Sequence, residues 1–121
     1  MDTLGHIYVQ ARLRGLKAAR KVKMLVDKGS TYLMISPKLA RKLGAIRLPE
    51  RIPTSFAVGA KEELEATALI LELEGRQGGA IAVIRECEGP LLGVEGLEAL
   101  GLKVDPSTRK LEPTRAYAAR V

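Results

Sequence analysis

Apolar and polar residues alternate along the start of the chain, from residue 7 to residue 14. A period of two is typical of a strand with one buried face. Residues 15–20 predict a turn, after which residues 22–26 resume the extended pattern and lead into a loop at residues 27–31. The chain therefore begins with a predicted β-hairpin. The positions expected to face inward on its first strand are Ile7, Val9, Ala11 and Leu13.

A short strand and a short helix follow this loop. Residues 32–35 are apolar and predict the strand. Ser36 is a suitable N-cap, Pro37 fits the first helical position, and Gly44 is a typical helix stop. The sequence therefore predicts a helix of about two turns. Its expected inward positions are Leu39, Ala40 and Leu43.

The middle of the chain again favours strands. Residues 54–58 and 63–69 predict the two arms of a second hairpin, with its tip at residues 58–61. Residues 75–79 predict a turn that leads into another extended segment at residues 80–85. These segments continue the succession of short strands separated by turns.

The last part of the chain predicts a second helix and further strands. Residues 94–100 carry apolar side chains at helical spacing, and Gly101 ends that pattern. Residues 102–104 and 115–121 predict strands, with a turn at residues 105–108 after the first of them. In total, about nine short strands and two short helices are expected. Turn signals at this spacing favour an all-β fold, a closed or nearly closed barrel.

Length and composition agree with one domain that spans residues 1–121. The chain has 121 residues, of which 46% are hydrophobic and 28% charged, a balance that supports a core without disulfides. Cys87 is the only cysteine, which indicates a reducing compartment, and we expect the cytoplasm. With no cation beside it in the sequence, its thiol is expected to be inert. No apolar run reaches the roughly 20 residues of a membrane span, so no membrane is expected.

The charge is unevenly distributed along the chain. Residues 1–47 hold eleven Lys or Arg residues against Asp2 and Asp27, whereas residues 48–121 hold nine against twelve acidic residues. A basic segment attracts phosphates, but the four aromatic residues are scattered rather than grouped for base stacking. The composition therefore does not favour nucleic acid as a partner. We interpret the basic side chains as the solvent-facing sides of the first hairpin and the first helix.

Several chemistries are excluded by residue counts. His6 is the only histidine, so one chain has too few nitrogen and sulfur ligands for the usual zinc site. A Ser/His/Asp triad would need His6, and nothing around it indicates a general base. The chain has no Walker-type loop and no glycine fingerprint for a dinucleotide. We expect no metal and no cofactor.

The candidate chemistry lies at Asp27, in the sequence Val26-Asp27-Lys28-Gly29-Ser30. An acidic residue here follows a buried strand and precedes a glycine. Asp-x-Gly alone is an ordinary turn sequence. The later segment Leu91-Leu92-Gly93, followed by the predicted helix, makes the combination more specific. Other acidic residues are weaker candidates, namely Asp105, Glu95 and Glu98.

With these two segments at this separation, the chain resembles the retropepsin-like aspartic proteases, in particular their small single-domain prokaryotic members. The resemblance spans nearly the whole chain. Its parts are an apolar strand, the Asp-x-Gly-Ser loop, a short strand and helix, a hairpin, and the Leu-Leu-Gly triplet that leads into a helix. It implies a retropepsin-like closed β-barrel with two short helices and a flap hairpin.

The resemblance also implies an activity and its residues. The chain would be an aspartic endopeptidase that hydrolyses peptides or unfolded proteins without a cofactor. Asp27 would be the catalytic carboxylate, Gly29 would keep its loop tight, and Ser30 would hydrogen-bond the outer oxygen of Asp27. The mechanism needs two carboxylates that share one proton, and one chain supplies one, so a homodimer is expected. The flap would cover the substrate with Val58, Gly59 and Ala60.

Lys28 departs from the family pattern, in which Thr or Ser follows the catalytic aspartate. The hydroxyl of that residue joins the two loops across the dimer axis, and an ammonium cannot accept a hydrogen bond. Paired with Asp27, Lys28 would hold the aspartates ionised. The hypothesis is that Lys28 weakens or abolishes proteolysis. One alternative is therefore an inactive homodimer that binds peptides in the same cleft, and a more distant one is a basic β-barrel that binds nucleic acid.

Overall fold

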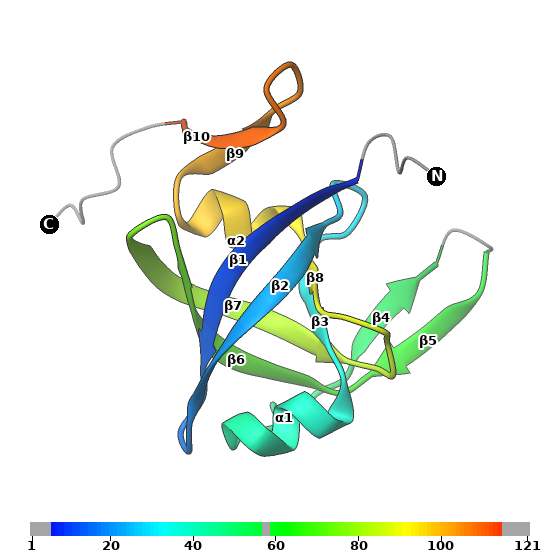
Figure 1. Ribbon diagram of the computed structural model, residues 1–121. Coiled ribbons are helices and arrows are strands. Elements are labelled where there is room, and N and C mark those ends of the chain that lie inside the picture. Colours follow the sequence, from blue (N-terminus) through cyan, green and yellow to red (C-terminus); the bar gives the residue numbers. More distant parts are fainter. Residues whose placement is uncertain (1–5, 57–58, 115–121) are drawn as a thin grey trace, which may run out of the picture.

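The structure is a computed structural model that describes residues 6–56 and 59–114, and these residues form ten strands and two helices (Figure 1). In chain order the elements are β1 (Ile7–Arg14), β2 (Ala19–Val26), β3 (Leu33–Ile35), α1 (Pro37–Leu43), β4 (Ile52–Ser55), β5 (Lys61–Leu64), β6 (Ala66–Leu73), β7 (Arg76–Ile84), β8 (Leu91–Leu92), α2 (Val94–Ala99), β9 (Leu102–Asp105) and β10 (Lys110–Pro113).

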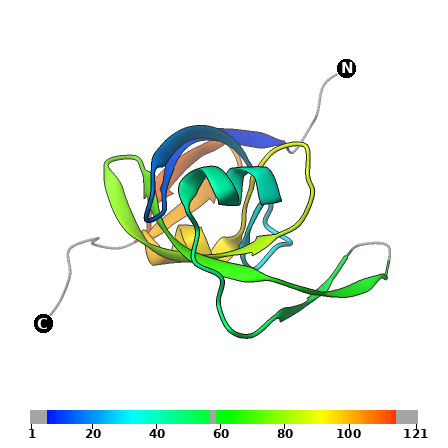
Figure 2. The same cartoon turned by 90° about the horizontal axis from the view of Figure 1, so that it is seen from below.

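Six strands close into a barrel in the order β1-β2-β8-β3-β7-β6, with β6 returning to β1. The pairs β2–β8 and β3–β7 are parallel, and the other neighbours are antiparallel. The closed barrel and the two short helices are thus confirmed. The remaining four strands form two separate hairpins, β4–β5 and β9–β10. The β4–β5 hairpin extends away from the barrel in both views (Figures 1 and 2).

The barrel encloses the main hydrophobic core. As the alternation predicts, Ala11 and Leu13 are buried on β1 and Ile7 and Val9 are partly buried, whereas the alternate residues of the strand are exposed. The largest side chains that are fully buried are Leu13, Met24, Leu33, Ile35, Leu43, Leu71, Leu92 and Leu100. A second, smaller cluster forms around Met34, Leu64 and Val83. Because it receives Phe56 and Ile52 from the β4–β5 segment, this cluster joins the hairpin to the barrel.

α1 covers one end of the barrel, opposite the β9–β10 hairpin (Figures 1 and 2). The Ser36 hydroxyl accepts a hydrogen bond from the Leu39 amide at 3.1 Å, and Pro37 is the first helical residue. Gly44 ends the helix with φ +68°, and a Cβ there would come within 2.4 Å of the Lys17 Cβ. The predicted caps of this helix are confirmed.

The turn predicted at residues 75–79 is shorter in the structure. Glu74 and Gly75 both have positive φ values, 54° and 73°. Two such residues make a tight hairpin turn whose twist matches the strands on either side. β7 therefore begins at Arg76, and its glycines pair with β6 instead of lying in a loop.

The predicted hairpin arm at residues 63–69 is divided between two strands. β5 ends at Leu64 and β6 begins at Ala66, because Glu65 carries the chain from the hairpin into the barrel. Its carbonyl accepts a hydrogen bond from the Ile84 amide at 2.8 Å. The first arm lies at Ile52–Ser55, which is earlier than predicted.

One strand near the end of the described residues was not predicted. The strand expected at residues 115–121 lies outside the described residues. The sequence did not predict β10, which pairs antiparallel with β9. Across residues 6–56 and 59–114, no helix combines the length and the apolar character that crossing a membrane requires.

Truncation of Leu71, which is fully buried in the barrel, tests the position of the core. Leu71→Ala is expected to lower the free energy of unfolding by about 2–5 kcal/mol, since it leaves a cavity. The same substitution at Leu16, which is 78% exposed, is expected to change it by less than about 0.5 kcal/mol. Urea unfolding measures both, and equal losses would contradict the observed barrel packing.

Candidate active site

Asp27 directly follows β2, at the point where this strand leaves the barrel core. Val26 is buried and pairs with Leu92 of β8. The Asp27 amide donates a hydrogen bond to the Leu92 carbonyl at 2.9 Å. One carboxylate oxygen of Asp27, Oδ1, accepts a hydrogen bond from the Gly29 amide at 3.0 Å. The carboxylate is therefore held by the backbone of its own loop and is half-buried.

The Asp27 loop is bound to the start of α2. The Val94 amide donates to the Ser30 carbonyl at 2.8 Å, and the Glu95 amide donates to the Thr31 carbonyl at 2.9 Å. These first helical amides have no partner within the helix, so the loop satisfies them. The two sequence segments that carried the candidate chemistry are thus in direct contact.

Gly93 permits this contact because it has no side chain. A Cβ at this position would lie 2.4 Å from the Tyr32 carbonyl oxygen and 2.7 Å from the Ser30 carbonyl oxygen. Both are backbone atoms that accept hydrogen bonds, the Tyr32 carbonyl from the Ser30 hydroxyl and the Ser30 carbonyl from the Val94 amide. The φ of Gly93 is −88°, which any residue adopts. Space, rather than backbone conformation, requires glycine here.

Ser30 makes a different hydrogen bond from the one expected. Its hydroxyl donates to the Tyr32 carbonyl at 2.9 Å. A hydroxyl has one proton to donate, so in this structure Ser30 does not donate to the Asp27 carboxylate. Ser30 instead holds its own loop together, and its backbone contacts α2.

Gly29 lies where the sequence predicted, in the tight turn after Asp27. A Cβ there would be 3.4 Å from the Asp27 Oδ1, which is at the edge of ordinary contact. The φ of Gly29 is not in the left-handed region that favours glycine. Within one chain, Gly29 therefore contacts the carboxylate through its backbone amide.

Asp27 borders a cleft of about 590 Å³ between the barrel and the β4–β5 hairpin. The wall opposite the Asp27 loop is formed by residues 53–56, including Phe56. Among the described residues of this lining, Asp27 is the single carboxylate. The lining consists of Asp27, Gly29, Ser30, Thr31, Tyr32, Met34, Pro53, Thr54, Ser55, Phe56, Val83 and Leu91.

The tip of the hairpin was predicted to contact substrate. Val58 lies outside the described residues. Gly59 and Ala60 are exposed, and neither borders the cleft. Gly59 has φ +88°, a conformation that favours glycine, and the Ala60 carbonyl accepts a hydrogen bond from the Phe56 amide at 2.9 Å.

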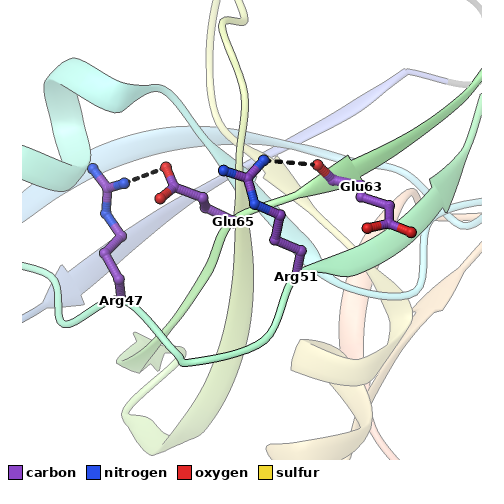
Figure 3. A network of polar contacts seen from close by, with 4 residues as sticks. All are labelled: Arg47, Arg51, Glu63 and Glu65. Carbon is purple, nitrogen blue, oxygen red and sulfur yellow. Dashed lines mark hydrogen bonds and ion pairs between the residues drawn. The ribbon is translucent and has the colours of Figure 1, made fainter.

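Polar contacts hold the base of the hairpin (Figure 3). The guanidinium of Arg47 forms an ion pair with the Glu65 carboxylate. Arg51 reaches the Glu63 carbonyl at 3.5 Å, while the Glu63 carboxylate points away from it. At the base of the hairpin, the Glu65 carboxylate is therefore paired with an arginine, whereas Arg51 binds the backbone of Glu63.

Lys28 is exposed beside Asp27. Within the described part of the chain, its ammonium forms no ion pair, and the Asp27 carboxylate is not bound to it. The inward pairing of Lys28 with Asp27 is thus not a feature of the single chain.

Two of the three competing acidic residues, Glu95 and Asp105, form hydrogen bonds that help to hold the fold together. A carboxylate oxygen of Glu95 accepts a hydrogen bond from the Ile81 amide at 3.1 Å and so ties α2 to β7. Hydrogen bonds from the Ser107 hydroxyl and the Ser107 amide hold the pKa of Asp105 below its usual value. Neither side chain borders the cleft.

Cys87 is half-buried at the edge of the second hydrophobic cluster. Burial raises the pKa of its thiol, the charge of Glu86 raises this pKa further, and the charge of Arg85 partly opposes the rise. A raised pKa leaves less thiolate at neutral pH, which agrees with an inert thiol. Among the described residues, no three His, Cys, Asp or Glu side chains are grouped as metal ligands.

Comparison with known proteins identifies the family. The model of the aspartyl protease family matches residues 9–79, which is more than half of the chain. The chain belongs to the aspartyl protease family. The matched segment includes Asp27 and the β4–β5 hairpin. No match was found among curated protein sequences.

Solved structures of proteases share the fold of this chain. The chain is similar to the EIAV protease in complex with the inhibitor HBY-793, with a TM-score of 0.66 at 15% identity over 87% of this chain and 97% of that one. It is also similar to a retropepsin-like aspartic protease from Rickettsia conorii, with a TM-score of 0.57 at 22% identity over 86% of this chain and 79% of that one. The predicted retropepsin-like fold is confirmed.

The sequence did not indicate the walls of this aspartyl protease cleft. Tyr32, Phe56 and Leu91 come from three distant segments, and in its own segment each looks like an ordinary strand residue. Met34 is buried in the second hydrophobic cluster and also borders the cleft. The sequence offered one indication of a cleft wall: Phe56 is the single phenylalanine of the chain and lies in a predicted hairpin arm.

The crowding around Gly93 predicts a strong effect of substitution. Gly93→Ala is expected to lower the free energy of unfolding by about 2 kcal/mol or more, because its Cβ would overlap two backbone carbonyls. Gly89→Ala is the matched control, since a Cβ there meets nothing within 4 Å. Chemical denaturation measures both, and a neutral Gly93→Ala variant would contradict the close approach of α2 to the Asp27 loop.

Proposed function

We propose that this chain is one half of an aspartic endopeptidase, and that the site is completed when two copies bring their Asp27 side chains together across a twofold axis. The observation that carries the proposal is the position of Asp27. It is held by backbone hydrogen bonds at the end of a core strand and opens into a cleft between the barrel and a hairpin. The family and the fold support the same conclusion.

The chemistry explains why two copies are needed. One carboxylate takes a proton from the attacking water, while the second, protonated carboxylate polarises the peptide carbonyl. Carboxylates about 3 Å apart cannot both ionise easily, so the pair shares one proton and titrates as a unit. The described lining of the cleft contains one carboxylate from this chain. A homodimer supplies the second.

The remaining site residues have supporting roles in this proposal. The Gly29 amide orients the Asp27 carboxylate, and Ser30 fixes the loop through the Tyr32 carbonyl and α2. Val58, Gly59 and Ala60 form the hairpin tip that would close over an extended peptide and exclude water. A peptide or an unfolded protein is the substrate, and the single half-buried thiol of Cys87 supports the cytoplasm as the compartment.

Replacement of the proposed catalytic carboxylate tests this function. Asp27→Asn keeps the shape of the side chain but removes the acid, and it is expected to lower kcat for peptide hydrolysis by about 10²–10⁴-fold. Asp105→Asn is the control, because that carboxylate lies outside the cleft. Cleavage of a denatured protein measures activity, and sedimentation measures the dimer. Full activity of Asp27→Asn, or activity from a strictly monomeric protein, would refute the proposal.

Lys28 supports a second candidate, a homodimer of the same fold that binds peptides without cleaving them. Its exposed ammonium lies next to Asp27, so two copies would bring two ammonium groups near the twofold axis. They would repel each other, or they would pair with the aspartates and hold both ionised, which removes the shared proton. Peptide binding without hydrolysis is the behaviour that distinguishes this candidate.

Substitution of Lys28 separates the two candidates. Lys28→Thr introduces a hydroxyl that can donate and accept hydrogen bonds, and it is expected to raise kcat/KM by about tenfold or more. Lys21→Thr is the control, because Lys21 is an exposed lysine of the preceding strand β2. This substitution is expected to leave kcat/KM unchanged. A parent protein that already cleaves peptides as fast as Lys28→Thr would show that Lys28 does not impair catalysis.

A further inference from the structure

The β4–β5 hairpin has little backbone attachment to the barrel. It forms its own two-stranded sheet, with Ile52 opposite Leu64 and Ser55 opposite Lys61. It projects from the barrel when the molecule is seen from below, with α1 lying across the view (Figure 2). An isolated two-stranded sheet is only marginally stable in water. The position of this hairpin therefore depends on side-chain contacts.

Arg85 makes two of these contacts with one guanidinium. Its Nε donates to Glu62 Oε1 at 3.3 Å, and its Nη2 donates to Glu62 Oε2 at 3.1 Å. The same guanidinium lies 4.2 Å from the centre of the Phe56 ring. Glu62 belongs to β5, whereas Phe56 follows β4. One side chain thus holds both arms of the hairpin.

The backbone of Arg85 is fixed to the barrel. Arg85 follows the last residue of β7, and its amide donates to the Ile35 carbonyl at 3.0 Å. The preceding amide, of Ile84, donates to the Glu65 carbonyl at 2.8 Å. The guanidinium therefore extends to the hairpin from a rigid point of the barrel.

We propose that Arg85 is a positioning residue that latches the β4–β5 hairpin to the barrel and so sets the position of the Phe56 wall of the cleft. The latch is defined as the contacts of Arg85 with Glu62 and Phe56. It is independent of catalysis. Its consequence for peptide binding rests on the proposed function, because Phe56 borders the same cleft as Asp27.

The chemistry of the latch requires arginine. A guanidinium is planar, donates two parallel hydrogen bonds to a carboxylate and stacks on an aromatic ring. A lysine ammonium keeps the charge but provides only a point contact. The Arg85 and Glu62 side chains are 40% and 43% exposed, so salt weakens their attraction. The latch therefore biases the position of the hairpin by a small free energy that depends on salt.

Hydrogen exchange of the hairpin amides tests the latch. In Glu62→Gln, amides of β4, β5 and Phe56 are expected to exchange about three- to tenfold faster, since the hairpin separates from the barrel more often. Glu63→Gln is the matched control, with the same charge change one residue along β5. The Glu63 carboxylate forms no ion pair within the described residues, so exchange is expected to remain at the parent rate. Equal acceleration in both variants, or none in Glu62→Gln, would overturn the proposal.

Two further measurements test the nature of the contact. Arg85→Lys is expected to accelerate amide exchange of the hairpin nearly as much as Glu62→Gln does. The double variant, Glu62→Gln with Arg85→Lys, is expected to exchange no faster than Glu62→Gln alone, because both substitutions remove the same contact. In the parent protein, about 1 M salt, where the Debye length is about 3 Å, is expected to accelerate exchange towards the rate of Glu62→Gln. Additive effects in the double variant, or an Arg85→Lys variant that exchanges like the parent, would show that Arg85 is not a latch.

Peptide kinetics separate the latch from the proposed function. If the hairpin covers substrate, Glu62→Gln is expected to raise KM several-fold with a smaller change in kcat, since binding must then also order the hairpin. Faster amide exchange with an unchanged KM would support the latch and contradict the role of the hairpin in substrate binding. Unchanged exchange would refute the latch whatever the activity.

Discussion

The position of Asp27 depends on how closely the start of α2 approaches the loop after β2. The backbone hydrogen bonds of Val94 and Glu95 to the carbonyls of Ser30 and Thr31 form only at that distance. Gly93 makes the approach possible, because any side chain there would overlap the Tyr32 and Ser30 carbonyls. The carboxylate is therefore positioned by main-chain atoms at the end of two core strands. Such an arrangement is rigid, because β8 and α2 must move for the loop to move.

The opposite wall of the cleft is built differently. The β4–β5 hairpin contributes Phe56 and neighbouring residues, yet it is attached through ion pairs, ring contacts and the small cluster around Met34, Leu64 and Val83. Half-exposed ion pairs contribute little each and respond to salt. The Asp27 carboxylate is thus held firmly, whereas the hairpin wall of the cleft is held by weak contacts. This combination suits the proposed reaction, in which the carboxylate must be positioned accurately while an extended peptide enters and leaves.

Lys28 is the residue of the Asp27 loop that departs from the family pattern. The fold and the family are those of aspartyl proteases, and the loop retains the aspartate, the glycine and the serine. In the proposed homodimer, the charge of Lys28 would influence whether the two Asp27 carboxylates share a proton. That influence is what separates the two candidate functions, cleavage and binding of peptides.

Local patterns in the sequence predicted the first hairpin, the caps of α1 and the Asp27 turn, since strand alternation and helix caps depend on residues a few positions apart. β10 was not predicted, because Lys110, Glu112 and Pro113 have no strand pattern, and its pairing with β9 decides the conformation. The glycines at the start of β7 indicated a turn, whereas the turn is made by Glu74 and Gly75. The sequence by itself determined the barrel class and made Asp27 the candidate acid. Tertiary structure alone decided what surrounds Asp27, namely the cleft walls, the crowding at Gly93 and the contacts of Arg85 with the hairpin. The physical reason is that closure of the barrel brings together segments that are distant in the sequence, and no local pattern in one segment indicates the others.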